Sequence, residues 1–204
     1  MEDKKYFSRQ IDESLMAWKS STRHKPLLLR GARQVGKSSS VRHLAKQFDY
    51  FVEINFERKP AYLEIFKGDR DAKHIVEMIK SITGEPIVPG KTLLFFDEIQ
   101  MCQEAISSLR FFWEDMPGLH VIAAGSLLEF ALSEIPTFGV GRIHSMFMYP
   151  MSFDEFLNAL GMFSLQKYKR EASPEKPLLS ALHEQLVSLF RTYLMVGGMP
   201  ESVS

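Results

Sequence analysis

The sequence predicts an α/β fold, in which a parallel sheet flanked by helices is followed by a small helical segment. Strand-like and helix-like segments alternate along most of the chain, and the strand-like segments are almost continuously apolar, as strands covered on both faces require. A glycine-containing loop at 31–38 directly follows the first of them. We expect the core over residues 1–150. The helical segment over 151–204 is expected to begin a lid or a C-terminal region that is incomplete here.

Apolar residues at helical spacing predict the helices of the core. They form four groups: Ile11, Leu15 and Trp18; Val41, Leu44, Ala45 and Phe48; Ile75, Ile79 and Ile82; and Ile106, Leu109, Phe112, Trp113 and Met116. The third helix is expected to span 72–82 and to end near Gly84, and the fourth to end at Pro117-Gly118.

Five apolar runs predict the strands. They cover 27–29, 50–55, 92–96, 119–124 and 143–149, and the run at 50–55 is rich in β-branched and aromatic residues. Because helices separate the first four, the connections are those of β-α-β units, and the sheet is expected to be parallel.

The sequence of the C-terminal segment predicts helices. Ser152 and Glu155 form a Ser-x-x-Glu capping box that is expected to open a helix through Leu160. The basic run at 167–170 is interpreted as a charged surface loop, with nucleic-acid contact as the lesser alternative. A leucine-rich stripe at 178–193 predicts a long helix that ends at 197–198, where two glycines follow each other.

Composition narrows the function classes modestly. The 204 residues contain 25 Lys+Arg and 25 Asp+Glu, so net charge gives nucleic-acid binding no support. The N-terminus lacks a signal-peptide pattern and no apolar stretch is long enough for a membrane span, which makes the cytoplasm the expected location. The only cysteine, Cys102, is assigned no role. The six histidines lack metal-ligand spacing, so no metal site built by protein ligands alone is expected.

The loop after the first strand matches G-x-x-x-x-G-K-[ST] at every fixed position. Glycines there allow backbone N–H groups to approach a polyphosphate, and the following helix points its positive dipole end at the anion. Lys37 is expected to reach the β- and γ-phosphates and Ser38 to bind Mg²⁺. The expected nucleotide-binding residues are Gly31, Ala32, Arg33, Gln34, Val35, Gly36, Lys37, Ser38 and Ser39.

A second motif indicates hydrolysis. The apolar strand at 93–96 ends in Asp97 and Glu98, as a Walker B strand does. Asp97 is expected to hold Mg²⁺ together with Ser38, and Glu98 to orient and polarise the attacking water. A small-molecule kinase does not need an acid poised on water, and the chain lacks the Asn-Lys-x-Asp guanine reader of GTPases. ATP hydrolysis is therefore favoured.

Three further residues are candidates, each with a structural alternative. Ser126 follows the strand at 119–124 and is either a sensor of the γ-phosphate or the cap of a following helix. In a sheet of order 5-1-4-3-2, Asn55 lies beside the Asp97-Glu98 strand and either holds Glu98 by a hydrogen bond or forms a turn. Arg142 either stabilises charge on the γ-phosphate, in cis or from a neighbouring subunit, or forms a structural ion pair.

Taken together, these motifs resemble the AAA-type ATPases of bacteria and archaea that carry a C-terminal domain of unknown function. The resemblance is carried by LLLRGARQVGKS (27–38), FVEINFE (51–57), LLFFDEIQ (93–100), AGS (124–126), VGR (140–142), YPMSFDEFL (149–157) and GGMPE (197–201). It implies an ASCE-type P-loop NTPase core that uses ATP and Mg²⁺ through Lys37, Ser38, Asp97 and Glu98. It also implies a further domain beyond the GGMPE segment.

We therefore expect a cytoplasmic Mg²⁺-dependent ATPase whose hydrolysis cycle drives a conformational change, with weak activity as an isolated domain. A second copy of the chain, or a protein partner bound through the helical tail, is the expected partner besides ATP, and no membrane is involved. The first alternative is a nucleotide switch that binds ATP without hydrolysing it, and the second is a small-molecule kinase. Glu98 separates hydrolysis from the switch, since only hydrolysis needs it.

Overall fold

The computed structural model describes residues 6–68, 71–126, 128 and 141–203. These residues form two compact units. One unit holds the sheet and comprises residues 11–33 and 37–148; the other comprises 6–10, 34–36 and 149–203 and holds the C-terminal helices. The expected division into a core over 1–150 and a helical segment over 151–204 stays a prediction; residues 6–10 and 34–36 are grouped here with the C-terminal helices.

A five-stranded parallel sheet forms the centre of the first unit. Its strands are β1 (Leu27–Arg30), β2 (Tyr50–Asn55), β3 (Thr92–Asp97), β4 (His120–Ala124) and β5 (His144–Phe147). They lie in the order β2-β3-β4-β1-β5, and every neighbouring pair is parallel. The predicted order 5-1-4-3-2 and the predicted parallel α/β class are both confirmed.

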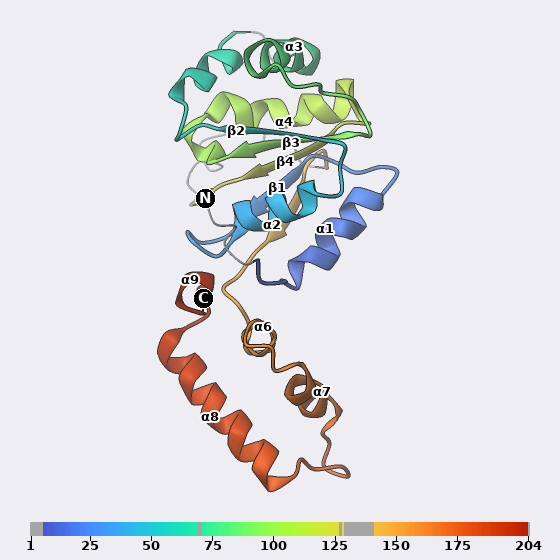
Figure 1. Ribbon diagram of the computed structural model, residues 1–204. Helices are drawn as coiled ribbons and strands as arrows, with labels where there is room; N and C mark the ends of the chain where they lie inside the picture. The colour runs from blue at the N-terminus through green and yellow to red at the C-terminus, as the bar shows by residue number, and fades with distance from the viewer. Residues whose placement is uncertain (1–5, 69–70, 127, 129–140, 204) are drawn as a thin grey trace. The chain divides into compact units, whose positions relative to one another are not determined.

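Helices cover both faces of the sheet. Figure 1 shows α3 (Ala72–Thr83) and α4 (Gln103–Asp115) on one side, and α1 (Ile11–Ser20) and α2 (Lys37–Ala45) on the other. Two short 3₁₀ helices, η1 (Pro60–Phe66) and η2 (Ile99–Met101), follow β2 and β3. β3 and β4 are buried along their whole length, which explains their continuous apolar sequence.

The core on the α3 and α4 side is aromatic. Phe66 and Phe112 each pack edge-on against Phe96 of β3, with ring centroids 5.4 and 5.8 Å from it. Phe56, just after β2, meets Phe66 at 5.4 Å. Such rings contribute large buried areas, so they join η1, α4 and the sheet into one core.

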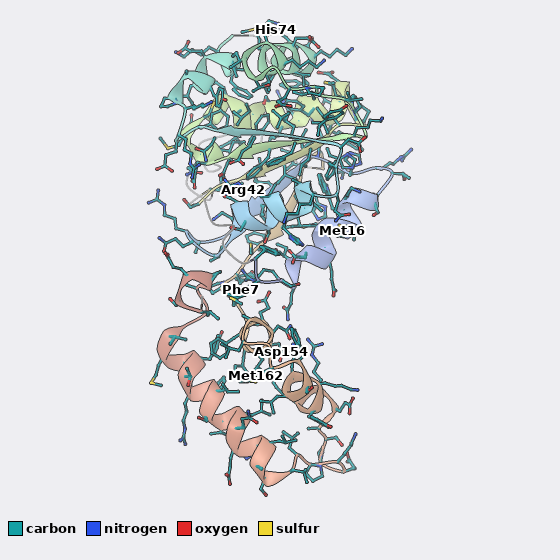
Figure 2. All side chains as sticks on the ribbon, in the orientation of Figure 1. Phe7, Met16, Arg42, His74, Asp154 and Met162 are labelled. Atoms are coloured by element: carbon teal, nitrogen blue, oxygen red, sulfur yellow. The ribbon has the colours of Figure 1, made fainter. Side chains whose placement is uncertain are left out.

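The C-terminal unit consists of α6 (Phe153–Ala159), α7 (Phe163–Glu171), α8 (Ser180–Val196) and α9 (Pro200–Val203). Leu157, Leu165 and Leu186 form its buried centre. Figure 2 labels Asp154 on α6 and Met162 at the start of α7. The predicted capping box is present on α6, where the Glu155 backbone N–H donates to Ser152 Oγ and the Ser152 N–H donates to the Glu155 carboxylate.

Two expectations about elements were wrong. The helix after the phosphate loop ends at Ala45, so Phe48 lies beyond it, where it packs against His120 with ring centroids 5.0 Å apart. The basic run at 167–170 is helical, because it belongs to α7. Lys169 Nζ lies 2.8 Å from Asp154 Oδ1, so an ion pair and the burial of Leu165 hold this segment against α6.

The parallel register brings the candidate residues to one edge of the sheet. Asp97, the last residue of β3, pairs with Asn55 of β2 and with Ala124 of β4. The phosphate loop leaves β1 after Arg30, at the same carboxyl edge. Ligands of open α/β sheets bind at this edge, so the fold places the two sequence motifs where they must meet.

Candidate nucleotide site

The loop between β1 and α2 has an unusual backbone. Gly31, Gln34 and Gly36 have φ angles of 144°, 62° and 103°. Glycine adopts such angles without strain, whereas Gln34 does so at a cost. Left-handed residues among right-handed ones can turn backbone N–H groups toward one side, as anion-binding loops before a helix N-terminus do. We therefore expect the loop before α2 to bind phosphate.

Lys37 is buried, with 8% of its surface exposed, and its ammonium group folds back onto the loop. Nζ donates to the Gly31 carbonyl at 2.9 Å and to the Ala32 carbonyl at 2.7 Å. Burial lowers the pKa of this ammonium, and the nearby charges of Glu98 and Asp97 oppose that shift. A buried cation at the loop is suited to binding an anion, because phosphate oxygens would give it stronger acceptors than carbonyls do.

Asp97 is the centre of a hydrogen-bond network at the end of β3. Its Oδ1 accepts from Ser38 Oγ at 2.9 Å, and its Oδ2 accepts from Asn55 Nδ2 at 3.0 Å. Burial raises the pKa of this carboxyl, the Ser38 bond opposes the rise, and the carboxylates of Glu53 and Glu98 add to it. The two residues expected to hold Mg²⁺, Ser38 and Asp97, therefore lie in contact.

Asn55 contacts a different carboxylate from the expected one. Its amide donates to Asp97, and its Oδ1 accepts from the Arg58 backbone N–H at 2.8 Å. The register explains the difference, because Asn55 is the direct partner of Asp97 across β2 and β3, whereas Glu98 lies one residue beyond the strand. The turn-forming alternative agrees with the Arg58 bond.

Glu98 adopts a left-handed backbone, with φ 53° and ψ 44°, directly after β3. Its Oε2 accepts from Gln100 Nε2 at 2.6 Å. A left-handed conformation in a non-glycine residue is uncommon and stores strain, which is often found at functional sites. Gln100 is part of the LLFFDEIQ motif, but sequence reasoning gave it no role. Its position two residues after the candidate base, Glu98, was the feature that could have indicated one.

Ser126 is buried at the same edge, just after β4, with 3% of its surface exposed. A Cβ at the residue before it, Gly125, would overlap Gln100 Oε1, so the Gln100 side chain would have to move to make room for it. The segment after β4 therefore lies against the segment after β3. The choice between a sensor and a helix cap for Ser126 depends in part on 127 and 129–140, which lie outside the described residues.

Arg142 lies away from the phosphate loop of its own chain. It precedes β5, whose first residue, His144, pairs with Leu27 at the start of β1, so Arg142 is at the amino edge of the sheet. Its Nε forms an ion pair with Glu114 Oε1 at 2.7 Å. The expectation that Arg142 acts in cis does not fit this placement. The structural ion pair is present, and action on a neighbouring subunit stays a prediction.

Arg42 is a further residue that sequence reasoning missed. It lies on α2, one turn after Ser38, and is labelled in Figure 2. Its guanidinium binds Glu53 in a bidentate manner, at 2.9 and 2.7 Å, and its NH2 lies 3.7 Å from Asp97 Oδ2. The basic side chain one helical turn after the loop was the available signal. Arg42 moderates the negative charge that gathers at the end of β3.

The residues present fit a magnesium nucleotide. Mg²⁺ prefers one or two protein oxygens and takes its other ligands from phosphates and water. Ser38 and Asp97 supply that number. Among the described residues, no group of three or more His, Cys, Asp or Glu is arranged to hold a metal without such help.

A phosphate loop after β1, an acidic pair at the end of β3 and a parallel sheet of this order define the P-loop nucleotide-binding class of α/β proteins. A family described as AAA domain matches residues 23–157, and the chain belongs to this family. It is thus a nucleotide-binding protein of the AAA type.

Comparison with known structures agrees on the fold. The solved structure of PCH-2 from C. elegans is similar to this chain, with a TM-score of 0.53 and 13% sequence identity. The match covers 95% of this chain and 59% of that one, so the chain spans less than two thirds of the length of PCH-2. No curated protein matches the chain. Among the described residues, no helix is both long and apolar enough to cross a membrane.

Proposed function

We propose that this protein binds ATP together with Mg²⁺ and hydrolyses it, and that the hydrolysis cycle changes the conformation of the C-terminal helices. Membership in the AAA domain family supports ATP as the nucleotide. The observation that carries the proposal is the contact between Ser38 and Asp97, 2.9 Å apart, beside the buried Lys37 and the acidic Glu98.

Each residue has a distinct part in the proposed reaction. The backbone N–H groups of 31–39 and the ammonium of Lys37 would bind the phosphate oxygens and offset charge that develops on them. Ser38 and Asp97 would hold Mg²⁺, which supplies electrostatic stabilisation of the transferred phosphoryl group. Glu98 would accept a proton from the attacking water and orient it in line.

The test compares wild type with Glu98→Gln and Lys37→Ala. We expect Lys37→Ala to lose ATP affinity by roughly 10-fold or more, since a buried charge-assisted contact is removed. Glu98→Gln should bind ATP normally and lose about 10²–10⁴-fold in phosphate release, the usual contribution of a general base. Binding is measured with a fluorescent ATP analogue, and turnover by phosphate release in the presence of Mg²⁺.

Two results separate this proposal from its alternative. Equal turnover by wild type and Glu98→Gln would contradict the role given to Glu98. Tight ATP binding without turnover in the wild type would instead support a switch that responds to nucleotide occupancy. Repeating the assay over a range of protein concentrations tests action between subunits, because turnover per subunit rises with concentration if Arg142 of one copy serves another.

A further inference from the structure

Gln100 is held against the proposed base by a short hydrogen bond. Its Nε2 donates to Glu98 Oε2 at 2.6 Å. A carboxylate can only accept a hydrogen bond, so the amide must turn its N–H₂ group toward Glu98 and its Oε1 the other way. The orientation of the Gln100 amide is therefore fixed by the chemistry of its neighbour.

The other end of the amide is enclosed. Gln100 Oε1 is buried and has no hydrogen-bond partner within the part of the chain that the structure describes. It lies against Gly125, where an added Cβ would overlap it and would also approach Leu128 Cδ2 at 3.2 Å. The side chain of Gln100 is thus confined between Glu98 and the segment that follows β4.

The backbone supports this arrangement. The left-handed conformation of Glu98 reverses the chain after β3 and starts η2, in which the Met101 N–H donates to the Glu98 carbonyl at 3.1 Å. Ile99, between the two polar residues, is fully buried and anchors the turn in the core. Because the turn is anchored, the side chains of Glu98 and Gln100 meet without the freedom that a surface loop would have.

We infer that Gln100 is a positioning residue for Glu98, an inference that rests on the proposed function. A general base works best when a third group orients it. Gln100 occupies Oε2 of Glu98 and leaves Oε1 to accept from the attacking water. Gly125 contributes to this arrangement, since the absence of a side chain there makes space for the Gln100 amide.

The first test is Gln100→Ala in the full chain, with kcat, KM and ATP affinity measured separately. We expect kcat to fall by roughly 10–100-fold, because a base that is no longer oriented retains part of its effect. KM and the affinity for a fluorescent ATP analogue should stay within about twofold, since Gln100 donates its hydrogen bond to Glu98 and not to the phosphate loop. Gln47→Ala is the matched control, because Gln47 is exposed in the turn after α2.

The second test uses combined variants, because their expected results differ from those of a merely structural role for Gln100. In a Glu98→Gln background, Gln100→Ala should cause no further loss, because the base it positions is gone. Gly125→Ala should also lower kcat by roughly 10-fold, since its Cβ displaces the Gln100 amide, and it should have little further effect when combined with Gln100→Ala.

The outcomes are distinguishable. If Gln100→Ala hydrolyses ATP at the normal rate and this turnover still depends on Glu98, only this inference is overturned. Raised turnover would also overturn this inference alone, because it would indicate that Gln100 restrains Glu98. The inference is also overturned if Gln100→Ala lowers turnover by the same factor in the wild type and in the Glu98→Gln background. Equal turnover by wild type and Glu98→Gln would overturn the proposed function, and this inference with it.

Discussion

At the scale of single residues, the end of β3 concentrates negative charge in a buried place. Asp97 is 4% exposed and lies near the carboxylates of Glu98 and Glu53. Ser38 and Asn55 donate to its two oxygens, and Arg42 lies 3.7 Å from one of them. A buried carboxylate with several donors is tolerated, but a divalent cation would neutralise it better. We therefore expect the end of β3 to bind a cation.

A second buried polar group lies at the opposite edge of the sheet. His120, at the start of β4, stacks on His24 with ring centroids 3.6 Å apart, and Trp18 packs edge-on against both. Since the Lys19 carbonyl can only accept, His120 Nε2 carries a proton and donates to it at 3.1 Å. Burial is the largest cause that lowers the pKa of His120 to about 4; the charges of His24 and Lys19 act in the same direction, and the hydrogen bond to the Lys19 carbonyl opposes the shift.

This shift predicts acid-dependent stability. The pKa of His120 is about 6.5 when unfolded and about 4 when folded, so protonation favours the unfolded chain. Stability is full above about pH 6.5 and falls between pH 6.5 and 4, by roughly 3–4 kcal/mol at most, since one pKa unit is worth about 1.4 kcal/mol. Chemical denaturation at several pH values should show a flatter profile for His120→Gln. Parallel profiles for the two proteins would refute the assignment.

Some of these residues were within reach of sequence reasoning and others were not. Lys37, Ser38 and Asp97 follow from fixed motif spacing, and the structure brings them together at one edge. The contact of Gln100 depends on a left-handed Glu98, which no propensity indicates. For Asn55, strand adjacency allowed either a bond to Glu98 or a turn, and only the residue register shows that it pairs with Asp97.

At the scale of elements, burial decided which segments could be predicted. β3 and β4 are buried throughout and carry the apolar runs that identify strands. α7 has only Leu165 and Gln166 buried, so its sequence has little apolar periodicity, and its position depends on ion pairs with Asp154 of α6. Contacts between segments, which local sequence does not encode, formed this helix.

The end of α8 depends on a close backbone approach. Gly198 O accepts from the Met151 N–H at 2.6 Å, and Tyr193 Oη donates to the Met151 carbonyl at 2.8 Å. A Cβ at Gly198 would overlap the Met151 carbonyl and approach Pro150 Cβ at 3.1 Å. Neither backbone nor a proline ring can yield easily, so glycine is needed here for space.

Gly198→Ala is therefore expected to detach the end of α8 from the segment before α6. The overlap should cost about 1–3 kcal/mol, the usual range for overpacking. Amide hydrogen exchange of residues 186–196 measures the effect, and faster exchange is expected. Gly118→Ala is the control, because its Cβ would meet only Pro89 Cβ at an ordinary 3.5 Å. Unchanged protection of α8 in Gly198→Ala would count against this account of the contact.

At the scale of the whole molecule, the middle of the phosphate loop belongs to the same compact unit as the C-terminal helices. Arg9 makes the connection within this unit. Its guanidinium, buried with 6% of the residue exposed, donates to the Val35 carbonyl at 2.6 Å, the Tyr149 carbonyl at 2.8 Å and Glu155 Oε1 at 3.0 Å. A single planar side chain thus joins the loop, the segment before α6 and α6 itself.

Glu155 is held as firmly as its partner. Burial alone would raise its pKa, but donation from the N–H groups of Gln10 and Ser152 and from Arg9 outweighs burial, so the pKa of Glu155 is lowered. The ion pair is fully formed above pH 4.5 and is lost as the pH falls through the lowered value. It therefore persists at neutral pH, where a movement of the loop can pass to α6.

This connection predicts that nucleotide binding alters the C-terminal helices through Arg9. In the wild type, ATP with Mg²⁺ should change amide exchange in α6 and α8 as well as in the loop. Arg9→Lys should bind ATP with similar affinity, because the lysine keeps a positive charge near Glu155. The variant should lose the change in amide exchange in α6 and α8, because an ammonium group lacks the planar guanidinium that bonds to three acceptors. Arg23→Met, a change at an exposed arginine, is the control.

The choice of lysine keeps this experiment interpretable. Arg9→Met would leave Glu155 buried without a cation, at a cost of roughly 3–5 kcal/mol, and unfolding would obscure any loss of coupling. With Arg9→Lys, retained ATP affinity and a retained melting temperature show that the fold is intact. If the exchange of α6 and α8 then still responds to ATP as in the wild type, the signal does not pass through Arg9. If only the variant fails to respond, the guanidinium is the link by which nucleotide binding reaches the helices.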